Sequence, residues 1–507
     1  MSVQRRGRRA DAAHTAIQQL PWQQPQLTLE PSRILSDDQI ETIHRQSLKV
    51  LEDIGMDVLL PEARDILQKA GARVSGERVR IGREIIEEAL KTPPAEFTFH
   101  ARNPAHNLRI GGKWITFAPV GGPPNCSDLD KGRRPGTLQD AGNFVKLSQF
   151  FNTVHTAGGA SVDALDVHAS VRHLYITANK MRYSDKVPFI YSTGRARLFD
   201  GLEIIRIARG ISHEQLLTEP SAYTVINTNS PLKLDTPMAM GIIEMARLNQ
   251  ICVVTPFTLA GAMAPITIIG ALVEQNAEAL AGLALSQLTN PGAPFVYGGF
   301  TSNVDMKSGA PAFGTPEYMK GCIIGGQLAR RYKLPYRTSS TNAANSVDAQ
   351  AAYETVFSLW GAIMGGGNVI QHAAGWMEGG LVASYEKFAL DVDLLQMVQE
   401  YLKPLVVDDD AMAFSAMQEV GPGGHFFGAQ HTLERYSTAF YQPLISDWRN
   451  FPNWEASGSP TAEKKANAVW KQALAEYTEP YMDEAIAEEI DAFVKRRVQE
   501  GGEKTDF

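Results

Sequence analysis

The chain has few cysteines: only Cys126, Cys252 and Cys322 occur among its 507 residues. They lie far apart and form no CxxC pair, so the sequence indicates neither a disulfide framework nor a zinc site made of thiolates. This scarcity is typical of a reducing compartment, and we expect a cytoplasmic location. No run of 18 apolar residues occurs either, so the sequence predicts no membrane span.

An excess of positive charge is also missing. The net charge of -8 argues against wholesale nucleic-acid binding. The basic opening stretch is followed by Asp11 and polar residues instead of an apolar segment, so it does not resemble a secretory signal. We interpret residues 1–35, which are rich in Gln, Pro and Arg, as an N-terminal arm without an assigned role. The rest has the composition of an ordinary folded protein with a large core.

Residues 36–110 predict an N-terminal helical segment with a few short strands. The stretch "SDDQIETIHRQSLKVLEDIG" has an N-cap serine, acids in its first turn, apolar residues at helical spacing and a closing glycine. A second helical pattern, "GREIIEEALKTPP", ends at its prolines.

Between residues 111 and 404, short β-prone runs alternate with helical patterns. Eight such runs occur, with starts 29 to 43 residues apart: "WITFAPV", "TVHTAGG", "VPFIYSTG", "AYTVINTNS", "ICVVTPFTLAG", "PFVYGGFTSN", "LPYRTSSTN" and "NVIQHAAG". Eight βα units without a Gly-x-Gly-x-x-Gly after the first strand favour an α/β fold of the closed (β/α)8 barrel type over a doubly wound sheet. Residues 405–507 predict a C-terminal helical extension whose long helices suit a symmetric contact, so we expect a homo-oligomer.

The loops after the strands should form the functional face of such a barrel. These predicted strand ends are rich in glycine, hydroxyl and amide groups but poor in acids. Paired carboxylates or a metal set, as in many barrel hydrolases, are therefore not indicated, and we predict no metal in this chain. The acid Asp348 follows a strand end, but it also suits the start of a helix, and the sequence leaves both roles open.

Two histidines lie close together further along the chain, but their spacing does not favour a metal site. His425 and His431 lie six residues apart among glycines, which is not the spacing of a metal pair on one helix face. A flap hinged at neighbouring glycines and carrying Phe426 and Phe427 is the more economical interpretation.

His372 and His155 lie at predicted strand ends, where a catalytic or a purely structural histidine would fit. Several aromatic residues also lie at strand ends and in the following loops instead of along one helix. Any single one could belong to the core, but together they could enclose an apolar or quaternary ammonium group. They are Phe257, Tyr297, Phe300, Tyr353 and Trp376.

Three stretches identify a resemblance to a known family. In order and spacing, "STNAANSVDAQAAYET", "GGGNVIQHAAGWMEGGLVASYEKF" and "GGHFFGAQHTLERY", leading to "FYQPLISDWRNFPNW", resemble the trimethylamine methyltransferase family. The family includes members without pyrrolysine that act on glycine betaine or related quaternary amines. The resemblance extends from about Ser36 to residue 495. It implies a TIM barrel that binds a methylated amine and transfers a methyl group to the cobalt of a corrinoid (cobalamin) carried by a partner protein.

One departure from the archaeal trimethylamine enzyme bears on the substrate. Pyrrolysine lies near the end of a late barrel strand there, whereas the loosely aligned region here, Arg337 to Thr341, has ordinary small polar residues. A tertiary amine must be activated before it can leave a methyl group, but a quaternary ammonium is already cationic. The resemblance therefore implies a quaternary amine such as glycine betaine, with proline betaine, carnitine or trimethylamine as alternatives.

Two other classes remain open at this point. A barrel without chemistry could simply bind a quaternary amine. An aldolase-like lyase is disfavoured, because none of the eight runs contains the lysine that a Schiff base requires.

By this resemblance we expect His372 and Gln371 to be catalytic residues in contact with the substrate. Phe257, Tyr297 and Trp376 would surround the methylammonium group. A substrate carboxylate could find its donor in Arg337, in His372, or in Asn and Ser side chains and backbone amides of the loops. The expected substrate-binding residues are Phe257, Tyr297, Phe300, Arg337, Ser339, Tyr353, Trp376, Asn229 and His155.

Overall fold

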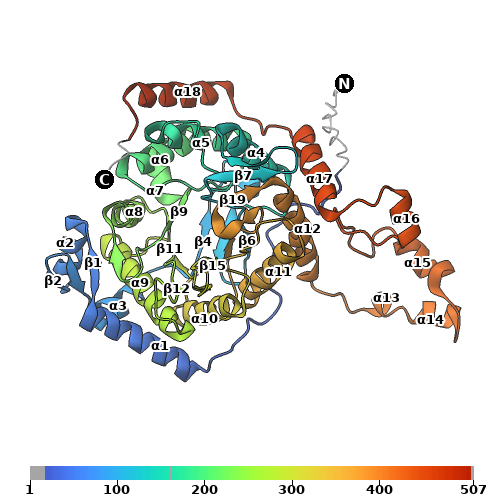
Figure 1. Ribbon diagram of the computed structural model, residues 1–507, viewed down its shortest axis with the longest axis horizontal. Coiled ribbons are helices and arrows are strands. Elements are labelled where there is room, and N and C mark those ends of the chain that lie inside the picture. The colour runs from blue at the N-terminus through green and yellow to red at the C-terminus, as the bar shows by residue number, and fades with distance from the viewer. Residues whose placement is uncertain (1–16, 160, 504–507) are drawn as a thin grey trace, which may run out of the picture.

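A parallel sheet that curls around itself forms the centre of the molecule (Figure 1). The computed structural model describes residues 17–159 and 161–503, so the arm predicted for residues 1–35 is described only from Ile17 onward. In spatial order, the six strands are β6 (Thr116–Phe117), β17 (Val369–Gln371), β16 (Tyr336–Ser339), β13 (Phe295–Gly298), β11 (Ile251–Val254) and β9 (Tyr223–Ile226). The α/β class predicted from the sequence is confirmed.

Two of the eight predicted runs, residues 153–159 and 187–194, form no regular strand. They nevertheless continue the sheet from β6 to β9, because His155 N donates to Phe117 O at 2.9 Å and Ala157 N donates to Val187 O at 2.9 Å. Ile190 N then donates to Tyr223 O at 3.0 Å. Regular strands were therefore the wrong prediction for these runs, since proline removes a ladder donor and paired glycines weaken strand pairing.

A helix follows each of the eight runs, as the repeat predicted. The helices are α4 (Leu138–Phe150), α5 (Ala169–Tyr183), α6 (Arg195–Arg209), α8 (Thr236–Arg247), α9 (Ile268–Thr289), α10 (Pro316–Tyr332), α11 (Ala349–Met364) and α12 (Tyr385–Tyr401), with the short α7 (His213–Thr218) after α6. Asp348, whose role the sequence left open, is the N-cap of α11 and accepts from the Gln350 and Ala351 backbone amides. Helix α9 alone among the described helices is long and apolar enough to cross a membrane, but 78% of its most apolar window is buried inside the protein, as in a core helix.

Smaller elements cover the ends of the central sheet. The N-terminal segment packs on α9 and contains α1 (Asp37–Lys49), a π-helical turn (Val50–Ile54), α2 (Pro61–Lys69), α3 (Arg83–Ala89) and the strands β1 (Met56–Val58), β2 (Arg73–Ser75) and β3 (Arg78–Arg80). These strands form a sheet with β10 (Lys233–Leu234), which comes from the loop after β9. Other short strands are the hairpin β4 (Glu96–Phe99) and β5 (Leu108–Gly111), and the loop strands β7 (Asn125–Asp128), β8 (Gly132–Pro135), β12 (Leu259–Ala260), β14 (Ser302–Val304), β15 (Pro311–Ala312), β18 (Trp376–Met377) and β19 (Val382–Ser384).

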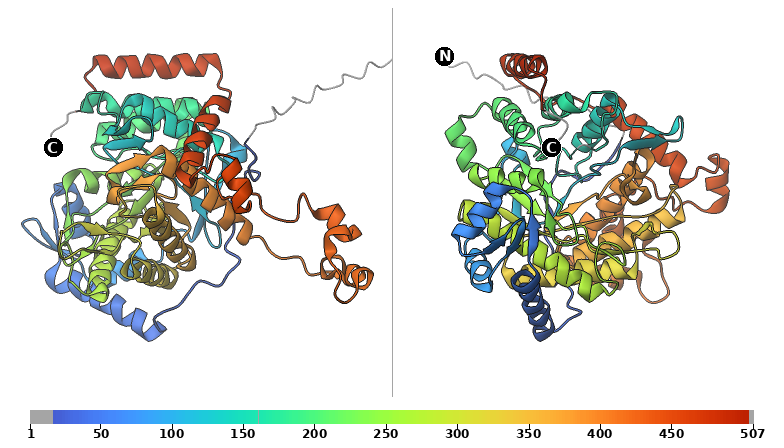
Figure 2. Two further views of the ribbon diagram at one scale, coloured as in Figure 1. Left: turned by 45° about the vertical axis from the view of Figure 1, so that its right-hand side comes forward. Right: turned by 60° about the vertical axis from the view of Figure 1, so that its left-hand side comes forward.

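The C-terminal part is helical, as predicted, but it does not lie entirely on the body. Its helices are α13 (Asp409–Met412), α14 (Phe414–Val420), α15 (Gln430–Arg435), α16 (Phe451–Ala456), α17 (Ala462–Glu476) and α18 (Glu484–Gln499). Helix α17 packs on α12 and α4, and α18 packs on α5 and α6. Residues 403–440 instead project away from the body (Figure 2).

A buried lysine holds the two irregular runs in place. Lys186 Nζ donates to the carbonyl oxygens of Ser148 at 2.6 Å, Phe151 at 3.0 Å and Val154 at 2.6 Å. An ammonium group has three donors, and here each one reaches a carbonyl at the end of α4 or at the start of the run 153–159. The lysine therefore replaces backbone pairing that the irregular runs lack.

Replacing this lysine should destabilise the protein. Lys186→Met leaves three buried carbonyls without their donor, and we expect the free energy of unfolding to fall by roughly 3 kcal/mol. Urea unfolding followed by circular dichroism measures the change, with Lys320→Met, at an exposed position of α10, as the control. Equal stability of the two variants would contradict this role.

Candidate active site

A cavity of about 440 Å³ opens at the carboxyl ends of the parallel strands. This is the end at which barrels of alternating strands and helices carry their functional loops. Its polar lining consists of Asp163, Asn227, Arg337, Gln371 and His372. Its aromatic lining consists of Phe189, Tyr191, Phe257, Phe300 and Trp376, and glycines 121, 122, 159, 379 and 380 complete the wall with Val225.

Arg337 is a buried cation without an acidic partner. It lies on β16, its residue is 3% exposed, and no ion pair of the described residues includes it. Its guanidinium carbon lies 5.2 Å from the centre of the Phe300 ring, and its Nε and Nη1 atoms have no hydrogen-bond partner within residues 17–159 and 161–503. Burial lowers the pKa of Arg337 to about 10, which still leaves the side chain cationic at neutral pH. A buried charge of this kind is costly unless an anion compensates it, so the cavity is suited to an anionic group.

His372 lies beside Arg337 at the end of β17. Arg337 Nη2 donates to His372 Nε2 across a long contact of 3.4 Å, and His372 Nδ1 has no partner among the described residues. Burial, followed by the positive charge of Arg337, holds the pKa of His372 well below its usual value. The imidazole is therefore neutral at neutral pH, and with Nε2 as the acceptor its Nδ1 carries the proton and is free to donate.

The backbone of His372 supports a functional role. Its φ of 59° lies in the left-handed region, which is uncommon for a residue other than glycine. Such strain persists where the surroundings enforce it, and it is concentrated at functional sites. Gln371, the preceding residue, lines the cavity and donates through Nε2 to Tyr223 Oη at 3.1 Å.

Aromatic rings form one side of the cavity. Phe300 lies 5.0 Å from Phe257 and 6.4 Å from Trp376 between ring centres, and the His372 ring lies 4.0 Å from that of Trp376. The turn after β18 presses on this wall: a Cβ built on Gly380, whose φ is 104°, would approach the Trp376 ring to 2.6 Å. The glycine is therefore required twice, by its backbone conformation and by its contact with the ring.

The structure brings together six of the residues expected from the sequence. They all line the cavity: Phe257, Phe300, Arg337, Gln371, His372 and Trp376.

The other five expected residues lie elsewhere. The Tyr297 hydroxyl donates to Asn276 on α9, so this ring faces the surrounding helices. Ser339 is buried, and its backbone carbonyl accepts from the Tyr318 hydroxyl. Tyr353 is 61% exposed on the outer face of α11, and Asn229 donates to Asp235 in an exposed loop. His155 is fully buried and accepts from the Phe117 amide through Nδ1, as a structural histidine does.

Several lining residues were missed by the sequence reasoning. Phe189 and Tyr191 alternate along the third run, and Val225 on β9 and Asn227 directly after it alternate along the fourth, so a spacing of two residues was a usable signal for one face. Asp163 had no such signal, because it lies in a loop. Burial raises the pKa of its carboxyl, although Arg172 lies 4.0 Å away.

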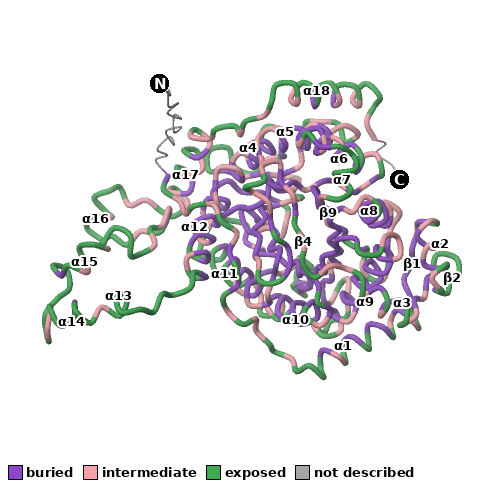
Figure 3. The backbone as a smooth tube through the Cα atoms, turned by 180° about the vertical axis from the view of Figure 1, so that it is seen from behind, coloured by how far each residue is buried: buried purple, intermediate pink, exposed green. Residues whose placement is uncertain are grey.

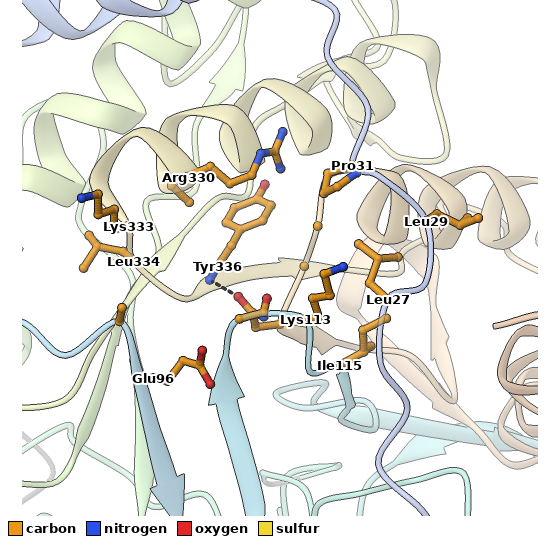
Figure 4. A pocket seen from close by; sticks show the side chains of 16 residues that line it. Leu27, Leu29, Pro31, Glu96, Lys113, Ile115, Arg330, Lys333, Leu334 and Tyr336 are labelled. Carbon is orange, nitrogen blue, oxygen red and sulfur yellow. Dashed lines mark hydrogen bonds between the residues drawn. The ribbon is translucent and has the colours of Figure 1, made fainter. Parts of the chain in front are cut away.

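A second cavity, of about 320 Å³, lies at the opposite end of the sheet (Figure 4). Lys113, Arg330, Lys333 and Tyr336 line it, and Tyr336 N donates there to Asn368 Oδ1 at 2.9 Å. These residues stand at the amino ends of strands, where structure in barrel enzymes serves stability instead of catalysis. We therefore assign the functional role to the first cavity.

Neither a metal cluster nor the expected flap is found at this cavity. Within residues 17–159 and 161–503 no group of three or more His, Cys, Asp and Glu side chains is arranged to hold a metal ion. Phe426 and Phe427 lie between α14 and α15 in the C-terminal extension and do not line the cavity.

Comparison with known proteins finds similarity to methyltransferases of methylated amines. A family model described as "Trimethylamine methyltransferase (MTTB)" matches residues 2–502. The chain is 37% identical over 472 residues to a glycine betaine methyltransferase of Desulfitobacterium hafniense (strain Y51), covering 93% of this chain and 98% of the relative. It is 28% identical over 482 residues to the trimethylamine methyltransferase MttB2 of Methanosarcina mazei, covering 91% and 94%.

A solved structure supports the fold alone. The Methanosarcina barkeri monomethylamine methyltransferase (MtmB) superposes with a TM-score of 0.52 at 12% identity, covering 88% of each chain.

A methyl group at Gly380 should disturb the aromatic wall. We expect Gly380→Ala to lower the free energy of unfolding by about 1–3 kcal/mol, because it adds backbone strain and displaces Trp376. Thermal unfolding and near-ultraviolet circular dichroism measure the two effects. The matched control is Gly309→Ala, at a φ of 75° with open space around the Cβ. If both variants lose the same free energy of unfolding and keep the same near-ultraviolet spectrum, the contact of Gly380 with Trp376 does not stabilise the protein.

Proposed function

This chain belongs to the trimethylamine methyltransferase family, and from that membership we propose that it transfers a methyl group from a carboxylated quaternary amine, of which glycine betaine is the simplest, to the cobalt of a corrinoid protein. The family resemblance drawn from the sequence and its methyltransferase activity are confirmed by the comparisons. The substrate and the acceptor belong to the proposal. We also infer that the eight hydrogen-bonded runs make up the closed (β/α)8 barrel expected from the sequence.

The unpaired guanidinium of Arg337 is the observation that carries the choice of substrate. A carboxylate is the anion that matches its planar donors, and Nε and Nη1 are both without a partner. Trimethylamine has no carboxylate and would leave this buried charge uncompensated. Glycine betaine, proline betaine and carnitine all supply one.

The aromatic side of the same cavity suits the other end of such a substrate. Faces of Phe257, Phe300 and Trp376 attract a quaternary ammonium group through the ring quadrupole. A quaternary ammonium cannot donate hydrogen bonds, so an aromatic wall without acceptors leaves no donor unsatisfied. The cost of binding there is the loss of the ammonium's hydration. Asp163 at the half-buried edge of the cavity adds a group of opposite charge when it is ionised.

The protein positions the substrate for methyl transfer and needs to move no proton. When the methyl carbon is attacked from the side opposite nitrogen, its C–N bond breaks and the electron pair stays on nitrogen. The substrate thereby becomes a neutral tertiary amine that keeps its carboxylate. Arg337 and the neutral His372 can fix the carboxylate while the aromatic rings orient the methyl groups, so the contribution of these residues is orientation and exclusion of water.

The methyl acceptor is a second substrate that must approach from outside. The macrocycle of a corrinoid is far larger than the cavity, so it fits only at the opening, where it would supply a strongly nucleophilic cobalt. Exposed apolar side chains stand in four different loops at this end of the sheet and provide a surface for a partner protein: Leu165, Ile266, Met306 and Leu381.

The proposed substrate class can be tested at Arg337. Removing a charge-assisted contact costs about 1.5–3 kcal/mol, so Arg337→Met should weaken glycine betaine binding roughly 10–100-fold. Choline has the same trimethylammonium group without a carboxylate, and its affinity should change less than about threefold because no such contact is lost. Calorimetry measures both, and the transfer itself is followed by the absorbance change of cob(I)alamin with each amine.

A surface arginine at the other end of the molecule provides the control. Arg109→Met should leave both ligands unaffected, because Arg109 is largely exposed and pairs with Glu96. Equal losses for betaine and choline in Arg337→Met would overturn the carboxylate assignment. Failure of every quaternary amine to methylate cob(I)alamin would overturn the proposed reaction.

The protonation state of His372 predicts the pH dependence. Because burial and Arg337 lower the pKa of His372, the imidazole stays neutral through neutral pH, and kcat/KM should show no histidine inflection between about pH 6 and 8. Arg337→Met removes the neighbouring positive charge, so the pKa of His372 should rise in that variant. Nitrogen-15 resonances of labelled histidine report it, and a wild-type His372 that protonates near pH 6.5 would contradict the assignment.

A further inference from the structure

The projecting part of the C-terminal extension has an unusual surface. We define the arm as residues 403–440, which leave the body at the end of α12 and extend sideways in both Figure 1 and Figure 2. Figure 3 shows that nearly all of it is exposed. Eleven of its large apolar side chains are more than two-fifths exposed, among them Leu405 at 92%, Phe427 at 85% and Phe440 at 78%.

The exposed apolar area of the arm is comparable to the area that one partner buries in a protein–protein interface. With about 200 Å² for a large side chain, the eleven expose on the order of 1,500 Å². The largest apolar patch on a typical monomer is about 300–600 Å². A standard interface buries about 800 Å² on each partner. The summed apolar exposure of the arm is therefore large enough to supply one side of a protein interface.

The same chain has a second unpartnered apolar surface beside the root of the arm. We define the patch as Tyr353, Val356, Phe357, Met397 and Tyr401, which are all exposed on α11 and α12. The ring of Trp360 joins the two helices at 5.4 Å from that of Tyr401. The exposed positions of α11 contain no charged residue, because its one charged side chain, Glu354, is buried. A helix on the outside of a barrel normally has a polar outer face.

The two surfaces are close in the chain but do not cover each other. The arm leaves the body directly after Tyr401, and it returns where Tyr441 Oη and the Leu444 amide donate to Asp393 Oδ1 on α12. Both roots therefore flank the patch, while the arm itself points away from it (Figure 1). A twofold axis near α12 would place the arm of each copy on the patch of the other, with identical contacts made twice.

From these two surfaces we propose that the protein is an obligate dimer of this chain, or a larger assembly built from that dimer, in which the arm of one copy packs on the patch of the other. A corrinoid protein is a less suitable occupant, because it must leave after each turnover and would expose both surfaces to water each time. Surfaces this apolar are typical of permanent assemblies. The proposal is independent of the substrate.

Sedimentation velocity of the full chain at micromolar concentration tests the assembly. The wild type should sediment as a dimer or a multiple of it. Val356→Asp with Phe357→Asp on the patch, or Phe427→Asp with Phe440→Asp on the arm, should at least halve the mass. The matched control is Phe199→Asp, because Phe199 is 42% exposed on α6, outside both surfaces, and this variant should keep the wild-type mass. A monomeric wild type would overturn the proposal.

Oxidative footprinting identifies which surface covers the patch even if a variant folds poorly. In the wild type, Tyr353, Met397 and Tyr401 should be protected from hydroxyl radicals in spite of their exposure in the single chain. The arm variant should increase their labelling severalfold. Unchanged protection in the arm variant, or protection that appears only when a corrinoid protein is added, would contradict the arm as the occupant.

Discussion

The guanidinium of Arg337 is the constraint around which the site is organised. It is a full positive charge inside the curled sheet, it has no acidic partner among the described residues, and it is surrounded by tyrosines, His372 and the face of Phe300. Burial, together with the charge of Arg337, lowers the pKa of His372 and keeps the imidazole neutral, and the unpaired donors of Arg337 select an anion. Because the transfer needs no acid or base, a site without carboxylate pairs is sufficient, and this explains why the strand ends are so poor in acids.

The sequence predicted the positions of strands, helices and strand-end residues, but it did not predict to which face of a strand each side chain points. The eight runs and their helices follow from periodicity, and Arg337, Gln371 and His372 follow from their place at strand ends. Tyr297 was wrongly placed near the substrate because its residue type was considered without its face of the strand. It is in register with Tyr336, and both hydroxyls bond to the surrounding helices. Asp163 could not be predicted, because loop positions follow no period.

The two irregular runs, residues 153–159 and 187–194, depend on buried lysines where the other runs have a regular ladder. Lys186 binds three carbonyls there, and Lys180 Nζ donates to Phe189 O at 2.7 Å. Phe189 and Tyr191 of the same run line the cavity. Side chains thus hold the wall on this side, where backbone pairing holds it elsewhere, and local opening should be easiest here because fewer ladder bonds must break.

The asymmetry between the two ends of the cavity has a consequence for turnover. The tertiary amine left after methyl transfer keeps the carboxylate that Arg337 would hold, and it loses only the positive charge that the aromatic wall attracts. Directly after the transfer, substrate and product therefore differ by the attraction of that charge to Phe257, Phe300 and Trp376, and to Asp163 when it is ionised. Loss of the attraction to the rings therefore favours release of the newly formed neutral amine, while Arg337 opposes its release by holding the carboxylate.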